Sequence, residues 1–109
     1  MQNENEQDIQ KTIIDYLRLK KFIVFKHHST GSTVRNNKAV FFKHGDKGVS
    51  DLIACSPKGQ FVAIEIKKNK GSKISDDQYA FIKNIILNKG IAFVAFSIDD
   101  VVKTLKKFT

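Results

Sequence analysis

Apolar and polar positions follow the clearest pattern between Gly48 and Lys67. Two short runs rich in β-branched residues, 49–55 and 61–67, are separated by the sequence SPKGQ, which is rich in turn formers. Runs of this kind around such a segment are typical of two strands joined by a tight connection, so the pattern predicts a β-hairpin. If the turn is centred on Lys58, Asp51 lies directly opposite Glu65.

Two carboxylates at this separation destabilise a sheet unless positive charge lies between them. Side chains alternate along a strand, so Lys67 shares a face with Glu65. Carboxylate oxygens are ligands that Mg²⁺ prefers, together with water and phosphate oxygens. The hairpin therefore predicts a metal site held by Asp51 and Glu65, with the backbone carbonyl of Ile66 as a further ligand. A shift of one residue in the register would put the two carboxylates on opposite faces.

The N-terminal segment, from about Asn5 to Lys20, has the spacing of an amphipathic helix. Acidic residues lie near its start and basic residues at its end, which suits the helix dipole. Glu6 lies on or beside the apolar stripe and has two interpretations. It is either a dipole partner at the helix start or a third carboxylate that reaches the Asp51 and Glu65 site. The apolar positions are Ile9, Ile13, Ile14, Tyr16 and Leu17.

The segment between this helix and the hairpin predicts a strand at 22–27, a polar loop at 29–37 and another short strand at 38–43. Residues 44–48 then form a turn into the hairpin. Its glycines are explained by tight-turn geometry, or by close approach of a phosphate backbone to the metal site.

After the hairpin, residues 68–73 form a basic, flexible connector. Ser75 and Gln78 have the spacing of a capping box, which predicts the start of a second helix. This helix is expected to run to about Asn88 and to be ended by Gly90.

The C-terminal part predicts a buried strand at 91–96 and a last helix at 101–107, which begins after Ser97 or Asp99. With no repeat and no second domain, residues 1–109 are expected to form a single α/β or α+β domain. A central mixed sheet would be flanked by helices.

The composition bounds the class of partner. The chain has 109 residues, enough for one modest core, and 19 Lys and Arg against 11 Asp and Glu give a net charge of +8. This excess favours a polyanionic partner, with nucleic acid as the leading candidate. There is no apolar run long enough to span a bilayer and no signal peptide, and the lone Cys55 excludes an internal disulfide. The cytoplasm of a bacterium or of a viral host cell is the expected setting.

The basic residues leave a second class of function open. A DNA-binding module without catalysis, recognising branched or duplex DNA, would explain the charge. It would not explain the paired carboxylates, which repel phosphate unless a metal is present. In either class the expected phosphate contacts are Lys43, Lys47, Lys68, Lys70 and Lys73.

The histidines do not predict a zinc site. His27, His28 and His44 lack the spacing of metal fingers, and only one cysteine is present.

Three short segments together resemble a known nuclease family. The spaced Asp and the Glu-x-Lys resemble the PD-(D/E)XK nuclease signature, and with the later glutamine the chain is similar to a small, stand-alone VRR-NUC domain of the kind found in phages. Ser50 stands where many members have proline. The segments are Lys47 to Leu52, Glu65 to Lys67, and Ser75 to Gln78 with the following Phe81 and Gly90.

The resemblance implies a restriction-endonuclease-like core and a Mg²⁺- or Mn²⁺-dependent DNA endonuclease. It also implies a preference for particular DNA structures, such as branched junctions, and a homodimer similar to Holliday junction resolvases. No membrane partner is implied. The family site maps onto Glu6, Asp51, Glu65 and Lys67, and its glutamine onto Gln78, which would position Lys67 or the substrate.

Overall fold

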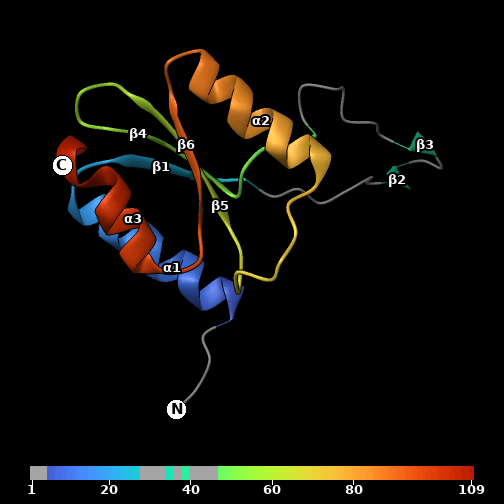
Figure 1. The fold of residues 1–109 in the computed structure, drawn as a ribbon, viewed down its shortest axis with the longest axis horizontal. Helices are drawn as coiled ribbons and strands as arrows, with labels where there is room; N and C mark the ends of the chain where they lie inside the picture. The colour runs from blue at the N-terminus through green and yellow to red at the C-terminus, as the bar shows by residue number, and fades with distance from the viewer. Residues whose placement is uncertain (1–4, 28–33, 36–37, 40–46) are drawn as a thin grey trace.

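The structure is a computed structural model, and it describes residues 5–27, 34–35, 38–39 and 47–109. It confirms the predicted α+β fold, with a central mixed sheet between helices (Figure 1). The elements are α1 (Glu6–Leu19), β1 (Ile23–Lys26), β2 (Val34–Arg35), β3 (Lys38–Ala39), β4 (Leu52–Cys55), β5 (Phe61–Ile66), α2 (Asp76–Leu87), β6 (Ile91–Ala95), α3 (Ile98–Leu105) and a 3₁₀ helix, η2 (Lys106–Phe108).

The main sheet has the strand order β1-β4-β5-β6. The first three of these strands are antiparallel, whereas β6 runs parallel to β5. Helix α2 provides the crossover that a parallel pair requires. In the β4–β5 hairpin Leu52 pairs with Ile64 and Cys55 with Phe61, the register that a turn centred on Lys58 requires. The predicted hairpin and its register are therefore confirmed.

One face of the sheet carries the main hydrophobic core. Helix α1 contacts β1, β5 and α3, and α3 contacts β6, so these two helices cover this face together (Figure 1). The apolar stripe predicted for the first helix points into this core. The buried residues of the core include Ile9, Ile13, Leu17, Phe22, Leu52, Ala54, Val62, Ile64, Ile66, Ala95, Val101 and Leu105.

The other face is covered only in part. Helix α2 contacts β5 and β6, and among the described residues it makes no comparable contact with β1 or β4. It has no fully buried side chain, and Tyr79 and Leu87 are 62% and 64% exposed. Burial on this side is concentrated below the helix, at Ala63 and Glu65 of β5.

Helix α2 ends differently from the sequence prediction. Its last residue is Leu87, and the left-handed conformation follows at Lys89 (φ 74°) rather than at Gly90. The backbone N–H groups of Lys89 and Gly90 bond to the carbonyls of Ile86 and Ile85, which is a Schellman motif. Gly90 is needed for space instead, because a Cβ there would lie 2.6 Å from Cγ2 of Ile85.

The C-terminal helix begins earlier than predicted. Ser97 is its N-cap, and α3 starts at Ile98 because a carboxylate oxygen of Asp100 accepts a hydrogen bond from the backbone N–H of Phe96, at 2.7 Å. This contact closes the turn before the helix. The strand before it, β6, is at the edge of the sheet, and only Ala92 and Ala95 are buried.

The segment between β1 and β4 is described only in part. The strand β2 falls inside the region predicted as a loop, and β3 covers only the start of the strand predicted for 38–43. The rest of that strand and residues 44–46 of the predicted turn lie outside the described residues. None of the described helices is both long and apolar enough to cross a bilayer.

Candidate active site

Asp51 is held at the end of the sheet where β4 begins and β5 ends. It precedes Leu52, the partner of Ile64, so the register continues to Asp51 opposite Glu65. One of its carboxylate oxygens accepts a hydrogen bond from the backbone N–H of Ile66 at 2.8 Å. The hairpin thus brings the two predicted carboxylates together and fixes the orientation of one of them.

Glu65 is buried, with only 2% of its surface exposed. Its Oε2 accepts a hydrogen bond from Nε2 of Gln78 at 3.0 Å and lies 3.8 Å from Nζ of Lys67, whereas its Oε1 is buried without a described partner. Burial raises the pKa of Glu65 to about 8, helped by the hydrogen bond and charge of Asp51 and the charge of Glu6, against the opposing charge of Lys67. The site therefore has more negative charge from its carboxylates than the ammonium group of Lys67 can balance.

Gln78 has two roles that one side chain fulfils at once. Its side-chain Oε1 accepts a hydrogen bond from the backbone N–H of Ser75 at 2.9 Å, and the backbone N–H of Gln78 donates to Oγ of Ser75 at 3.1 Å. This confirms the predicted capping box. The amide nitrogen remains free to donate to Glu65. The capping spacing was visible in the sequence, but the contact with Glu65 depends on how α2 lies on the sheet.

Gly48 allows the start of α2 to lie this close. Its φ is +75°, and a Cβ at this position would overlap the backbone of Asp77 and lie 2.6 Å from the backbone nitrogen of Gln78. A side chain would therefore push the helix start away from the hairpin. The glycine predicted for the turn is required for the turn conformation and also for contact with α2.

Glu6 lies at the same end of the sheet, on the first turn of α1. A hollow of about 70 Å³ is lined by Glu6, Gln7, Gln10, Asp51 and Ile66. This volume is sufficient for several water molecules. Glu6 is one of the acidic residues in the first turn of α1, which suits the helix dipole, and it also lines the hollow beside Asp51, so its position is compatible with both interpretations.

The donor set suits a hard divalent cation. Among the described residues, no three Asp, Glu, His or Cys side chains converge tightly enough to form a complete metal cage. The buried Oε1 of Glu65, which has no partner among the described residues, the carboxylate of Asp51 and the hollow beside Asp51 nevertheless suit an oxygen-ligated ion with several water ligands.

The predicted phosphate contacts surround this end of the sheet unevenly. Lys47 is exposed just before the hairpin, and three further lysines are exposed on the connector between β5 and α2, at 68, 70 and 73. Lys43 lies outside the described residues. The connector follows Lys67 directly, so its positive charge lies close to the carboxylates along the chain.

His27 lies beside Asp51, although its place in the sequence suggested only a comparison with zinc ligands. Its backbone N–H donates to the carbonyl of Asp51 at 2.8 Å, which continues the β1–β4 pairing by one residue. The available signal was its place at the end of the first predicted strand. That position does not place His27 beside Asp51 unless the pairing of this strand with β4 is known.

Comparisons with known proteins agree with the geometry. The family model of the VRR-NUC domain matches residues 4–97. A solved structure titled "VRR_NUC domain" has a TM-score of 0.68 at 19% identity, covering 95% of this chain and 97% of the other. A second, "VRR_NUC domain protein", has a TM-score of 0.67 at 17% identity, covering 99% of this chain and 90% of the other. No curated protein matches the chain.

The two structural neighbours share the fold, and the family match extends over most of the chain, including every element that builds the carboxylate site. Such domains are nucleases of the PD-(D/E)XK type, which hydrolyse phosphodiester bonds in DNA and typically use divalent metals. This chain belongs to the VRR-NUC family.

Proposed function

We propose that this protein is a Mg²⁺- or Mn²⁺-dependent DNA endonuclease whose catalytic centre is formed by Asp51, Glu65 and Lys67. The observation that carries the proposal is the pairing of the two carboxylates across the hairpin, with one oxygen of Glu65 buried and without a hydrogen-bond partner in the described part of the chain. In a binding module without a metal, the paired carboxylates would repel the phosphate backbone, so that class of function does not explain them.

The residues of the site have separate tasks in this proposal. Asp51, Glu65, Glu6 and the carbonyl of Ile66 hold the cation. A bound divalent ion supplies a Lewis acid and an activated water. Lys67 orients or deprotonates the attacking water and balances phosphate charge. Gln78 is assigned to the catalytic set because its hydrogen bond to Oε2 of Glu65 holds that carboxylate beside Lys67.

The exposed lysines would bind the DNA backbone on either side of the cut. Lys47 and the connector lysines Lys68, Lys70 and Lys73 form this set among the described residues, and Lys43 is assigned to it from the sequence. Branched DNA brings several phosphate backbones near one basic surface, which is why we propose a preference for junctions over linear duplex.

We also propose that the protein works as a homodimer. One chain has one site, so symmetric cutting of two strands needs two copies. The half of the sheet that α2 leaves uncovered exposes Ile23, Phe25 and Phe61 by 60%, 61% and 44%. Apolar residues grouped on one side in this way favour contact with another protein surface.

The test is cleavage of a labelled panel that contains linear duplex, single strand, flap, splayed arms and a four-way junction, with Mg²⁺, Mn²⁺ or EDTA. Lys67→Ala is compared with Lys58→Ala, a lysine exposed in the hairpin turn at the far end of the same strands. We expect metal-dependent cutting that Lys67→Ala loses by at least about a hundredfold and Lys58→Ala retains.

Glu65→Gln provides the second variant. It keeps the size of the side chain but removes the charge, so we expect loss of cleavage with folding and DNA binding retained. Full turnover by Glu65→Gln would contradict the assignment. Junction binding without any cutting by the wild type would favour the non-catalytic module.

A further inference from the structure

The end of β1 contributes a third polar side chain to the row of carboxylates. Lys26 pairs with Leu52, and the bond from the N–H of His27 to the carbonyl of Asp51 continues this register. Directly opposed residues on neighbouring strands have side chains on the same face. His27, Asp51 and Glu65 therefore form a row across three strands, with Asp51 in the middle.

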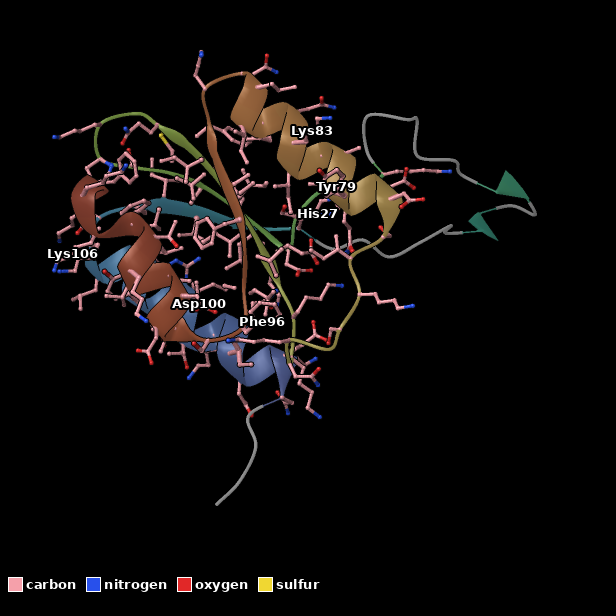
Figure 2. The ribbon with its side chains drawn as sticks, in the orientation of Figure 1. His27, Tyr79, Lys83, Phe96, Asp100 and Lys106 are labelled. Carbon is pink, nitrogen blue, oxygen red and sulfur yellow. The ribbon has the colours of Figure 1, made fainter. Side chains whose placement is uncertain are left out.

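The two ring nitrogens of His27 have different surroundings. Nδ1 is buried and has no hydrogen-bond partner among the described residues. The side chain as a whole is only half-buried, so the opposite edge of the ring, which carries Nε2, is the exposed one. Figure 2 shows His27 on the side of the molecule where α2 lies, away from Asp100 on the α3 side.

A purely structural role does not account for this ring. Buried polar atoms in folded proteins are almost always hydrogen bonded, and a histidine that only supports the fold would use Nδ1 in this way. Among the described residues, no hydrogen bond joins the ring to another side chain. Because a buried N–H without an acceptor is costly, the ring favours the form that carries its proton on Nε2.

A role as a ligand to the same cation is also disfavoured. Neighbouring strands are about 4.7–4.9 Å apart, so His27 lies roughly two strand spacings from Glu65.

We propose that His27 is a substrate-contacting residue, whose Nε2 edge donates a hydrogen bond to a phosphate oxygen of the DNA strand being cut. The contacted phosphate lies on the side of Asp51 away from Glu65. This inference rests on the proposed nuclease function and adds to it a contact with the DNA backbone on the other side of Asp51. Lys67 is positioned to contact phosphate beside Glu65, and His27 offers a hydrogen-bond donor on the side of Asp51, where carboxylates alone would repel DNA.

The variants separate the two ring nitrogens. The amide nitrogen of Gln can occupy the position of Nε2, whereas the shorter Asn side chain reaches only the position of Nδ1. We expect His27→Ala and His27→Asn to cleave about ten- to a hundredfold more slowly than wild type, the range expected for one hydrogen bond to a charged group. His27→Gln should recover most of the rate. Equal rates for Asn and Gln would overturn the proposal.

A scan of neutral phosphates identifies the contact. Single phosphates around the cut are replaced by methylphosphonates, and binding is measured with Ca²⁺ in place of Mg²⁺ for wild type and His27→Ala. One replacement should weaken binding of the wild type about tenfold and leave His27→Ala unchanged. If every replacement affects both proteins equally, His27 does not contact the backbone.

The two proposals fail in distinguishable ways. If wild type cuts DNA and His27→Ala cuts equally well, the nuclease assignment stands and the role of His27 falls. If wild type cuts no substrate, the nuclease assignment falls, and the same binding scan, made over the phosphates of a bound four-way junction, decides whether His27 touches a phosphate. Metal titration followed by the melting temperature of the DNA-free protein is the remaining control, since loss of Mg²⁺ stabilisation in His27→Ala would make His27 a ligand and overturn the proposal.

Discussion

The two faces of the central sheet differ in what covers them and in what they contain. The face below α1 and α3 is closed by apolar side chains from β4, β5 and β6, and several of these, such as Ile64, have no exposed surface. The face below α2 is half open and contains Asp51, Glu65 and His27 beside exposed apolar side chains. One face thus supplies the stability that lets the other hold a buried carboxylate with an unpaired oxygen.

The largest expected difference between the faces is in the free energy of unfolding that is lost when a side chain is truncated to Ala. Ile64→Ala removes a fully buried side chain, and we expect a loss of about 2–5 kcal/mol in the free energy of unfolding. Ile53 is its neighbour in β4 but points to the other face and is half-buried, so Ile53→Ala should cost less than about 1.5 kcal/mol. Urea denaturation measures both, and similar losses would refute the asymmetry between the faces.

The second prediction concerns the junction of the hairpin with α2. Gly48→Ala should cost about 2–4 kcal/mol, because the new Cβ adds backbone strain and a collision with the start of the helix. Gly59→Ala is the matched control. It also has positive φ, at +85°, but has open space around it, so only the strain of about 1–2 kcal/mol applies. Cleavage should fall with Gly48→Ala alone.

The third prediction is the effect of pH on the metal-free protein. The folded state raises the pKa of Glu65 from 4.5 to about 8, so it binds a proton more tightly than the unfolded chain does. The resulting stability is fully present below pH 4.5 and is lost as pH rises through 8. Glu65→Gln should remove this loss and be more stable than wild type by roughly 4–5 kcal/mol at pH 8.5.

Thermal melting in EDTA across pH 5 to 9 measures this dependence. Addition of Mg²⁺ should raise the melting temperature of wild type most at high pH, where the carboxylate is free to bind it, and should leave Glu65→Gln nearly unchanged. A metal effect of equal size in both proteins would remove Glu65 from the proposed ligands.

The smallest expected effect is a gain in stability of the same size at the ends of α1 and α2, which lie on opposite faces of the sheet. Helices α1 and α2 each end with a lysine in the left-handed conformation, Lys21 (φ 71°) and Lys89 (φ 74°). Replacement of either by Gly should stabilise the protein by about 1 kcal/mol, because glycine adopts this conformation without a steric cost. Unequal gains would mean that the helix ends contribute to the difference between the faces.

Local patterns predicted the elements that hold the proposed site. The turn formers around Lys58 set the register that pairs Asp51 with Glu65, and the Ser75 to Gln78 spacing set the start of α2. Both depend on contacts within a few residues, which a sequence displays directly.

Contacts between distant segments could not be predicted in this way. The close approach of Gly48 to α2 and the place of His27 beside Asp51 depend on how separate elements dock. The end of α2 near Asn88 was predicted, but the residue that ends the helix was not. Glycine is the usual left-handed residue after a helix, but at Lys89 the hydrogen bonds of the Schellman motif hold a lysine in that conformation.

The shared amide of Gln78 has a consequence for synthesis of the chain. The hairpin that carries Asp51 and Glu65 leaves the ribosome before α2 does, and until the first turn of α2 forms, no amide is available to hold Glu65 beside Lys67. Helix capping and positioning of the carboxylate then occur in one event. A nascent chain therefore contains both carboxylates before the contact that holds Glu65 beside Lys67 can form.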